Sequence, residues 1–327
     1  METFKVAVTD YTFKDLDIER NVLSKEKDIE LIEGHARTQE EVVKLAKKAD
    51  GIITQYAPIN DFVLKQLDKC KIISCYGVGV DTVDLNTANM NNIYVCNVPD
   101  YCTEEVSNHA LTLLLNCSKK IVALNNQVKN GKWDFKTAVP IRRFSTQIVG
   151  ILGYGRIPKR LTEKLINLGF TVLVYDPYVP KIDIKKANAL PCSLEYIFKN
   201  SDFLSVHLPL TDKTSGLINE KLFRLAKSSL IIINTSRGEV INEKDLIIAL
   251  KLKKIGGAAL DVIEKEPIEP DNPLLQMNNV ILTPHIAWYS EESQLELRRK
   301  CAENILNFFQ NKNPKYVVNK KFIDTII

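Results

Sequence analysis

Short apolar runs alternate along the chain with longer stretches in which apolar residues recur every three or four positions. The short runs have the length of buried strands, and the longer stretches have the period of helices that bury one face. This alternation predicts an α/β protein in which helices cover parallel sheets. The expected strands span residues 6–9, 51–54, 72–75, 147–152, 171–175, 203–206, 230–234, 257–260 and 280–282.

Helical segments mark the larger divisions of the chain. Thr38 and Glu41 have the spacing of a capping box before a helical run at residues 42–48. A long helical stretch begins near Thr103 and is expected to leave the first series of strands, and the second series starts well beyond it. One more amphipathic helix is expected at residues 291–309.

Composition narrows the class of protein. The chain has 327 residues, 45% of them hydrophobic and 26% charged, which is enough for two cores of common domain size. Its 44 Lys and Arg residues against 40 Asp and Glu leave a net charge of +4 without a basic stripe, so we expect no nucleic-acid partner. Residues 1–10 lack the apolar core of a signal peptide and no apolar run could span a bilayer, so we expect a cytoplasmic protein without membrane contact. Seven cysteines, an odd number without metal-ligand spacing, predict reduced thiols and no metal site.

A glycine-rich turn follows the strand expected at residues 147–152 and leads into a helix. In this context Gly153 allows a tight turn, Gly155 lets the backbone approach a pyrophosphate, and the helix N-terminus faces the negative charge. Pro158 stands where the dinucleotide-binding pattern has a third glycine. A proline in the first helical turn loses no needed hydrogen bond, although we expect its ring to affect how closely the helix packs on the strand.

Asp176 closes the next strand, 21 residues beyond Gly155. That is the distance expected for the acid that binds the adenosine ribose hydroxyls, and a carboxylate there would repel a 2′-phosphate. Strand, glycine turn, helix and acid together predict NAD rather than NADP as the cofactor. The alternative is that Asp176 and Pro177 only start a turn, as Asp-Pro pairs often do.

Three residues that could perform chemistry lie just beyond strands of the same series, where ligand crevices form in open α/β sheets. Arg237 could bind a substrate carboxylate through a two-pronged pair. His285 could exchange a proton with a substrate oxygen near neutral pH, and Glu266 could orient its ring. Each also has a structural explanation: a solvated loop arginine, a surface charge run, and a histidine that ends a strand.

Four histidines are present, which limits the choice of an acid–base group. His35 has the setting of a turn residue and His109 that of a helix residue. This leaves His207 and His285 at the ends of strands. The combination of His285 with the arginine and the glutamate favours His285.

In this order, these segments resemble the D-isomer-specific 2-hydroxyacid dehydrogenase family over essentially the whole chain. The signatures are residues 153–155 with Asp176, 201–210, 234–238, 256–261 with 266–267, and 283–285. The resemblance implies that Arg237 anchors the substrate, that His285 is the acid–base group and that Glu266 is its partner.

The resemblance also implies binding roles for residues outside the catalytic trio. Backbone amides of Val78 and Gly79 would meet the substrate carboxylate, and Asp261 would contact the nicotinamide amide. The remaining implied cofactor contacts are Thr103, Arg156, Ile157, Leu208, Pro209, Thr235 and Ser236.

The family architecture implies two flavodoxin-like or Rossmann-like domains with parallel sheets. A substrate domain would comprise residues 1–102 plus 290–327, and an NAD-binding domain at residues 103–289 would be inserted in it. Family members are usually homodimers built through the cofactor domain, so a homodimer is expected here.

Within the family, residues 175–178 and 287–292 look most like the carboxyl-terminal-binding corepressors and their bacterial relatives. The 3-phosphoglycerate dehydrogenases are the other near neighbours, and they hold the substrate phosphate with an arginine before the glycines of the substrate loop. This chain has Cys75 there, and Gln55 stands at a second position where an arginine is expected. We therefore expect a substrate without a phosphate group.

The sequence thus predicts an NAD-dependent oxidoreductase that moves a hydride between nicotinamide and a small D-2-hydroxy acid or 2-oxo acid. Two alternatives stay open: 3-phosphoglycerate dehydrogenase, and a corepressor-like scaffold that senses NAD(H). The corepressors retain the catalytic trio as well. Because the chain stops shortly after the last helix, without an added tail or regulatory domain, we favour the enzyme.

Overall fold

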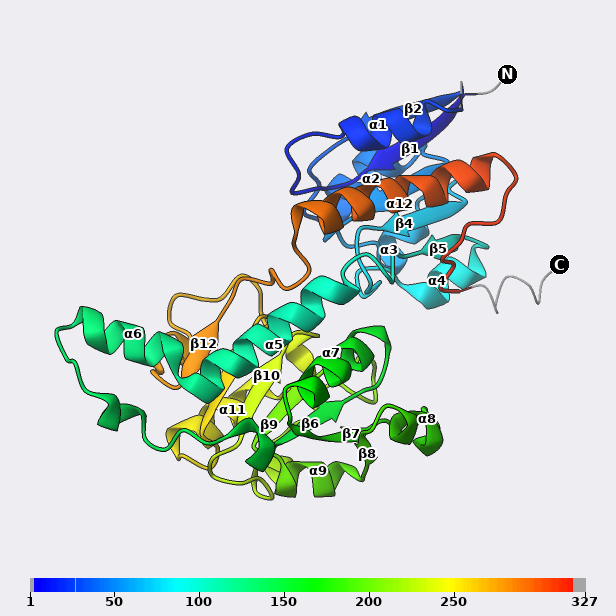
Figure 1. Cartoon of the computed structure of the whole chain (residues 1–327). Coiled ribbons are helices and arrows are strands. Elements are labelled where there is room, and N and C mark those ends of the chain that lie inside the picture. The colour runs from blue at the N-terminus through cyan, green and yellow to red at the C-terminus, as the bar shows by residue number, and fades with distance from the viewer. Residues whose placement is uncertain (1–2, 27, 320–327) are drawn as a thin grey trace. The chain divides into compact units, whose positions relative to one another are not determined.

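The computed structural model describes residues 3–26 and 28–319, and the chain folds into two compact units (Figure 1). The first unit combines Met1–Tyr101 with Ser290–Ile327, and the second is Cys102–Tyr289. The second unit is therefore inserted into the first in the order of the sequence.

The first unit is built on a five-stranded parallel sheet in the order β2-β1-β3-β4-β5. This is the strand order of flavodoxin-like folds. The strands are β1 (Phe4–Val8), β2 (Ile29–Glu33), β3 (Gly51–Thr54), β4 (Ile72–Cys75) and β5 (Tyr94–Cys96). The helices are α1 (Asp17–Leu23), α2 (Gln39–Ala46), α3 (Asp61–Leu64), α4 (Leu85–Met90) and α12 (Glu291–Phe309).

Local sequence explains where these helices begin. The Thr38 hydroxyl accepts from the Glu41 N–H while the Glu41 carboxylate accepts from the Thr38 N–H, so the predicted capping box at the start of α2 is confirmed. Ser290 and Ser293 form the same reciprocal pair at the start of α12. Through α12 the C-terminal part of the chain returns to pack on α1 and β4 (Figure 1).

The second unit is built on a seven-stranded parallel sheet in the order β12-β11-β10-β9-β6-β7-β8. Starting from β8, the first six strands follow the order 3-2-1-4-5-6 of the Rossmann fold, so the strand order reverses between β6 and β9. The strands are β6 (Ile148–Leu152), β7 (Thr171–Tyr175), β8 (Leu190–Pro191), β9 (Phe203–Val206), β10 (Ile231–Asn234), β11 (Gly257–Leu260) and β12 (Val280–Leu282). The helices are α5 (Thr103–Lys119), α6 (Ile121–Lys129), α7 (Arg156–Asn167), α8 (Lys181–Lys186), α9 (Leu194–Asn200), α10 (Glu220–Phe223) and α11 (Glu243–Lys251), with 3-10 turns η1 (Phe135–Ala138), η2 (Phe144–Thr146), η3 (Gly238–Val240) and η4 (Pro273–Gln276).

Both faces of this second sheet are covered, which explains why its central strands are continuous apolar runs. Val149 and Ile151 point into one cluster with residues of α5 and α7, while Leu152 belongs to a cluster on the opposite face with residues of α9, α10 and α11. The predicted α/β class with parallel sheets is therefore confirmed. Each predicted strand is present, with its ends within two residues of the expected ones.

Candidate active site

The glycine turn after β6 has the geometry that a phosphate-binding loop requires. Gly153 has φ +85°, and a Cβ added there would stand 2.7 Å from the carbonyl oxygen of His207, so only glycine fits. Gly155 precedes the first residue of α7, and a Cβ added there would meet nothing within 4 Å. The turn is thus closed toward the sheet and open on the side from which a ligand would approach. Pro158 is buried in the first turn of α7, which continues through it without a break.

Asp176 connects the end of β7 to the glycine turn. One carboxylate oxygen accepts from the backbone N–H of Tyr154 at 2.8 Å, and the other accepts from the N–H groups of Tyr178 and Val179 at 2.8 and 3.2 Å. The turn role of Asp176 is therefore present in the structure. The bond to Tyr154 goes beyond it, because it places the carboxylate beside the glycine turn.

The turn after β10 is organised by Asn234, which lies in the signature segment 234–238 but was given no role of its own from the sequence. The buried Asn234 side chain accepts from the N–H and the hydroxyl of Ser236, and donates to the backbone oxygen of Arg237 at 2.9 Å. An asparagine at a strand end that folds the next three residues into a turn is a recognisable signal. The buried hydroxyl of Thr235 has no hydrogen-bond partner among the described residues.

Gly238 was also given no role from the sequence, and the structure explains why a glycine stands there: the backbone of Ile263 approaches it closely. A Cβ added at Gly238 would lie 1.9 Å from the backbone carbon of Ile263, so no larger residue fits. This contact brings the turn that carries Arg237 against the segment that carries Glu266. The Arg237 guanidinium donates to the backbone oxygen of Ser236 at 2.7 Å.

Glu266 and His285, 19 residues apart in sequence, meet directly. His285 Nδ1 lies 2.7 Å from Glu266 Oε2, and Glu266 Oε1 accepts from the N–H of Ile263 at 3.2 Å. Burial raises the pKa of Glu266, but the hydrogen bond and charge of His285, the Ile263 N–H and the Arg237 charge together hold that pKa below its usual range. About a third of each side chain remains exposed to solvent. His285 and Arg237 therefore both act on the charge of Glu266, which links the three predicted catalytic residues.

His285 has an uncommon backbone conformation, with φ +50°. For a residue with a side chain the left-handed region costs roughly 1–2 kcal/mol, and it is found mainly where the surroundings enforce it. Asp261 provides that enforcement: its backbone oxygen accepts from the His285 N–H at 2.8 Å, and its carboxylate accepts from the N–H groups of Ile286 and Ala287 at 3.0 and 2.9 Å. Asp261 is 2% exposed, and the Thr283 hydroxyl adds a further bond to the same carboxylate.

His207, the second histidine at a strand end, has surroundings that differ from those of His285. His207 Nε2 lies 2.8 Å from the Ser205 hydroxyl, and burial lowers the pKa of His207 to about 3. An imidazole that resists protonation to that degree cannot supply a proton near neutral pH. This supports the choice of His285.

The other residues implied as cofactor contacts open helices or follow strands of the second unit. Thr103 is the first residue of α5, Arg156 and Ile157 open α7, and Leu208 and Pro209 follow β9. Arg156 and Pro209 are exposed, whereas Leu208 is buried. Their roles stay predictions.

Val78 and Gly79 belong to the first unit, in the loop after β4. The loop is pinned by two bonds: the Asn97 side chain donates to the Val78 oxygen at 2.7 Å, and the Val98 N–H donates to the Gly77 oxygen at 2.8 Å. Val78 is 37% exposed, and its predicted role in binding the substrate stays a prediction.

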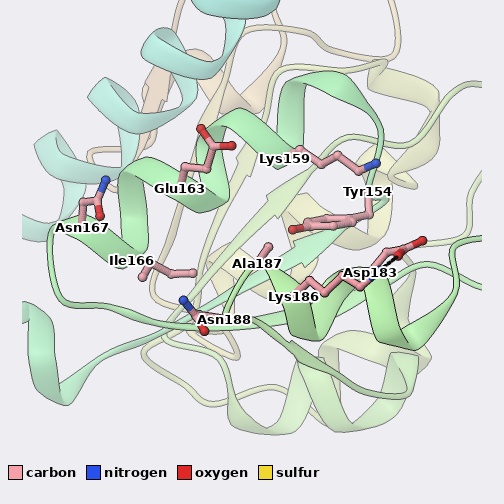
Figure 2. Close-up of a pocket in the computed structure, with 9 residues that line it drawn as sticks. All are labelled: Tyr154, Lys159, Glu163, Ile166, Asn167, Asp183, Lys186, Ala187 and Asn188. Carbon is pink, nitrogen blue, oxygen red and sulfur yellow. Dashed lines mark hydrogen bonds and ion pairs between the residues drawn. The ribbon is translucent and has the colours of Figure 1, made fainter.

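A pocket of about 700 Å³ opens between α7 and α8 (Figure 2). The ring of Tyr154, the residue between the two glycines of the turn, forms part of its wall. None of the predicted catalytic residues lines it, so it lies outside the constellation described above. The lining residues are Tyr154, Lys159, Glu163, Ile166, Asn167, Asp183, Lys186, Ala187 and Asn188.

These observations test whether a dinucleotide would fit the second unit. The open space at Gly155, the unpartnered Thr235 hydroxyl and the carboxylate of Asp176 beside the glycine turn are the features that such a ligand requires.

Within residues 3–26 and 28–319 no group of three or more His, Cys, Asp or Glu side chains could hold a metal ion. Across the same residues, every helix is too short or too polar to cross a membrane.

Comparison with known proteins gives a consistent result. The family model described as "D-isomer specific 2-hydroxyacid dehydrogenase, NAD binding domain" matches residues 111–287. The chain is 34% identical over 287 residues to a glyoxylate reductase of Korarchaeum cryptofilum, covering 86% of each protein. A D-lactate dehydrogenase from Aquifex aeolicus, solved in complex with NAD and lactic acid, has a TM-score of 0.85 at 26% identity, covering 98% of both chains.

A further relative is longer than this chain. The D-3-phosphoglycerate dehydrogenase of Archaeoglobus fulgidus is 34% identical over 288 residues, which is 88% of this chain and 54% of that relative. The chain therefore spans about half the length of that dehydrogenase.

Proposed function

Because the chain belongs to the D-isomer specific 2-hydroxyacid dehydrogenase family, we propose that it transfers a hydride between NAD(H) and a small D-2-hydroxy acid or its 2-oxo acid. The observation that carries the proposal is the 2.7 Å contact between His285 Nδ1 and Glu266 Oε2, with the Arg237 charge acting on the same carboxylate. The NAD-binding family model and the D-lactate dehydrogenase structure with NAD support this cofactor.

The residues of this chain have distinct tasks in that reaction. A bound nicotinamide would donate the hydride from C4 in reduction of the 2-oxo acid and would accept it there in oxidation of the 2-hydroxy acid. The Arg237 guanidinium binds the substrate carboxylate and fixes the orientation of the neighbouring carbonyl. Because Nδ1 of His285 is engaged by Glu266, Nε2 is the nitrogen that gives a proton to the carbonyl oxygen in reduction and receives one in oxidation. The Glu266 carboxylate fixes the orientation of the His285 ring through this contact.

The first experiment is NADH oxidation by the purified protein with a panel of 2-oxo acids, with His285→Ala alongside and His35→Ala as the matched control. His35 is exposed, lies in the first unit, and is not among the proposed site residues. We expect turnover in the wild type and in His35→Ala, and none in His285→Ala, whose NADH affinity stays nearly intact. Tight NADH binding without turnover on any acid would favour the NAD(H)-sensing scaffold.

The proposed substrate carries no phosphate. Gln55 and Cys75 stand where phosphate-binding arginines are expected, and neither provides a cation. The Gln55 oxygen accepts from the N–H and hydroxyl of Thr12 at 2.9 and 3.2 Å, while the buried Cys75 thiol has a pKa raised by burial. Hydroxypyruvate and 3-phosphohydroxypyruvate differ only in that phosphate. We expect the first to be reduced with the higher kcat/KM, and efficient turnover of the second would favour 3-phosphoglycerate dehydrogenase.

We also propose that the protein is a homodimer formed through the second unit. The segment from α6 to η2 exposes a set of apolar side chains, and none of the residues in α6 is buried. Trp133 is 90% exposed, Phe135 76% and Val139 62%, which is unusual for side chains of this size in a monomer. Sedimentation should give a dimer for the wild type and a monomer for Trp133→Ser with Phe135→Ser. Tyr178→Ser, at another exposed aromatic residue of the same unit, should stay dimeric.

A further inference from the structure

His109, a residue of α5, contacts the segment that carries the catalytic histidine. α5 packs against β10 and β11, and His109 Nε2 lies 3.0 Å from the Thr283 hydroxyl and 3.5 Å from Asp261 Oδ1. Thr283 follows β12 and stands two residues before His285. A helix histidine is thus in hydrogen-bond contact with the loop where the proposed chemistry takes place.

The direction of these hydrogen bonds follows from the available protons. The Thr283 hydroxyl lies 2.5 Å from Asp261 Oδ1, and a carboxylate can only accept. The single hydroxyl proton of Thr283 is therefore donated to Asp261. The contact between His109 and Thr283 must then use a proton on His109 Nε2, so the network assigns the ring a proton at this nitrogen.

Asp261 connects Thr283 to the backbone of residues 285–287. Its carboxylate accepts from the N–H groups of Ile286 and Ala287, and its backbone oxygen accepts from the N–H of His285. These three bonds enclose the residue with φ +50°. When Thr283 fixes the orientation of the Asp261 carboxylate, its two oxygens can accept from the Ile286 and Ala287 N–H groups at the same time. A carboxylate that rotates freely would swap its oxygens between these two N–H groups.

We propose that His109 is a positioning residue: through Thr283 and Asp261 it holds His285 in the left-handed conformation in which its Nδ1 meets Glu266. The role in turnover rests on the proposed function, because His285 must act as the acid–base group for its orientation to affect the rate. His109 itself need not touch the substrate or the cofactor.

Two matched pairs of variants test the chain of contacts. Thr283→Val removes the hydroxyl at nearly constant shape, and Thr283→Ser retains it. His109→Leu removes the donor, and His109→Gln can place an amide N–H where Nε2 stands. We expect kcat to fall about tenfold in Thr283→Val and His109→Leu, with the Kd for NADH within about twofold of wild type, and to recover largely in Thr283→Ser and His109→Gln.

Non-additivity provides the second criterion. Because both residues act through the same Asp261 carboxylate, the double variant His109→Leu with Thr283→Val should be no slower than the slower single variant. A kcat that stays at the wild-type value in Thr283→Val would overturn the proposal. So would a loss confined to NADH affinity, or a double variant whose loss equals the product of the two single losses.

A measurement without substrate separates this inference from the proposed function. Hydrogen exchange of a peptide spanning residues 283–289 reports the amides of Ile286 and Ala287 directly. We expect faster exchange in His109→Leu and Thr283→Val than in the wild type. Faster exchange in a protein that turns over no 2-oxo acid would support the positioning role while the proposed function fails. Unchanged exchange together with unchanged turnover would refute the positioning role alone.

Discussion

The half-buried imidazole of His207 should make the stability of the second unit sensitive to acid. Burial lowers its pKa from 6.5 to about 3, so between these values an unfolded chain binds a proton that the folded chain excludes. The stability contributed by the neutral ring is fully present above the unfolded pKa and is lost progressively as the pH falls toward the folded value. Replacing His207 with Gln, which can still contact the Ser205 hydroxyl, removes this pH-dependent contribution to the free energy of unfolding.

The magnitude follows from the size of the shift. At about pH 5 the unfolded ring lies roughly 1.5 pH units below its pKa, and each unit corresponds to about 1.4 kcal/mol, which gives an upper limit of about 2 kcal/mol. Because the residue is not completely buried, solvent reduces this value, and we expect a loss of about 1–2 kcal/mol relative to pH 7.5.

Urea unfolding followed by tryptophan fluorescence is a suitable assay, because both tryptophans, Trp133 and Trp288, lie in the same unit as His207. The free energy of unfolding should fall more steeply with acid in the wild type than in His207→Gln. His35→Gln, a change at an exposed histidine of the first unit, serves as the control and should keep the wild-type slope. If the wild type and His207→Gln differ by the same free energy at both pH values, the reasoning is refuted.

Three further changes have defined outcomes. Gly238→Ala forces a Cβ to within 1.9 Å of the Ile263 backbone carbon and should lower the free energy of unfolding by about 1–3 kcal/mol, as measured by denaturant titration; wild-type stability would contradict the close approach. Asp176→Ala should raise the kcat/KM for NADPH relative to NADH, whereas an unchanged ratio would leave Asp176 with its turn role only. Glu266→Gln should lower kcat by about tenfold or more. Because the pKa of Glu266 is lowered, the difference in kcat from wild type should persist from neutral pH down to about pH 5 and narrow only as the pH falls through that lowered pKa. A difference in kcat that vanishes near pH 6 would show that another group carries the effect.

Most of the strands that sequence patterns predict are buried along most of their length. Gly51–Thr54 and Ile72–Cys75 are buried at every position and consist mainly of apolar residues, as expected for strands whose two faces are both covered. β2, β5 and β8 were not predicted; each lies at the edge of a sheet, where β12 was the one edge strand that the pattern predicted. β2 contains two exposed glutamates among its five residues, and β8 has only two residues.

The candidate site divides in the same way. Glycine, aspartate, arginine, glutamate and histidine at strand ends are visible as residue types, and the order of the segments indicates the family. The left-handed conformation of His285 is not visible, because it depends on hydrogen bonds to Asp261, which is 24 residues away in the sequence and follows the neighbouring strand β11. The close approach of Gly238 to Ile263 is likewise not visible, because it depends on how neighbouring turns meet, whereas the turn formed by Asn234 is local and could have been recognised. Asp176 shows that one residue can start a turn and also contact the glycine loop, so the two interpretations of its sequence position were not exclusive.

The contact between His109 and Thr283 also bears on how the second unit is inserted. His109 stands seven residues after the start of that unit, and Thr283 six residues before its end. The hydrogen bond between them therefore holds the two ends of the inserted segment close together inside the unit itself. A module whose entry and exit are adjacent can be placed in a loop of a host protein without spreading that loop apart. Residues 102–289 should on this basis tolerate being moved as a cassette, or having their ends joined by a short linker and new termini opened elsewhere, and such rearranged chains offer a direct route to exchanging nucleotide-binding modules between enzymes.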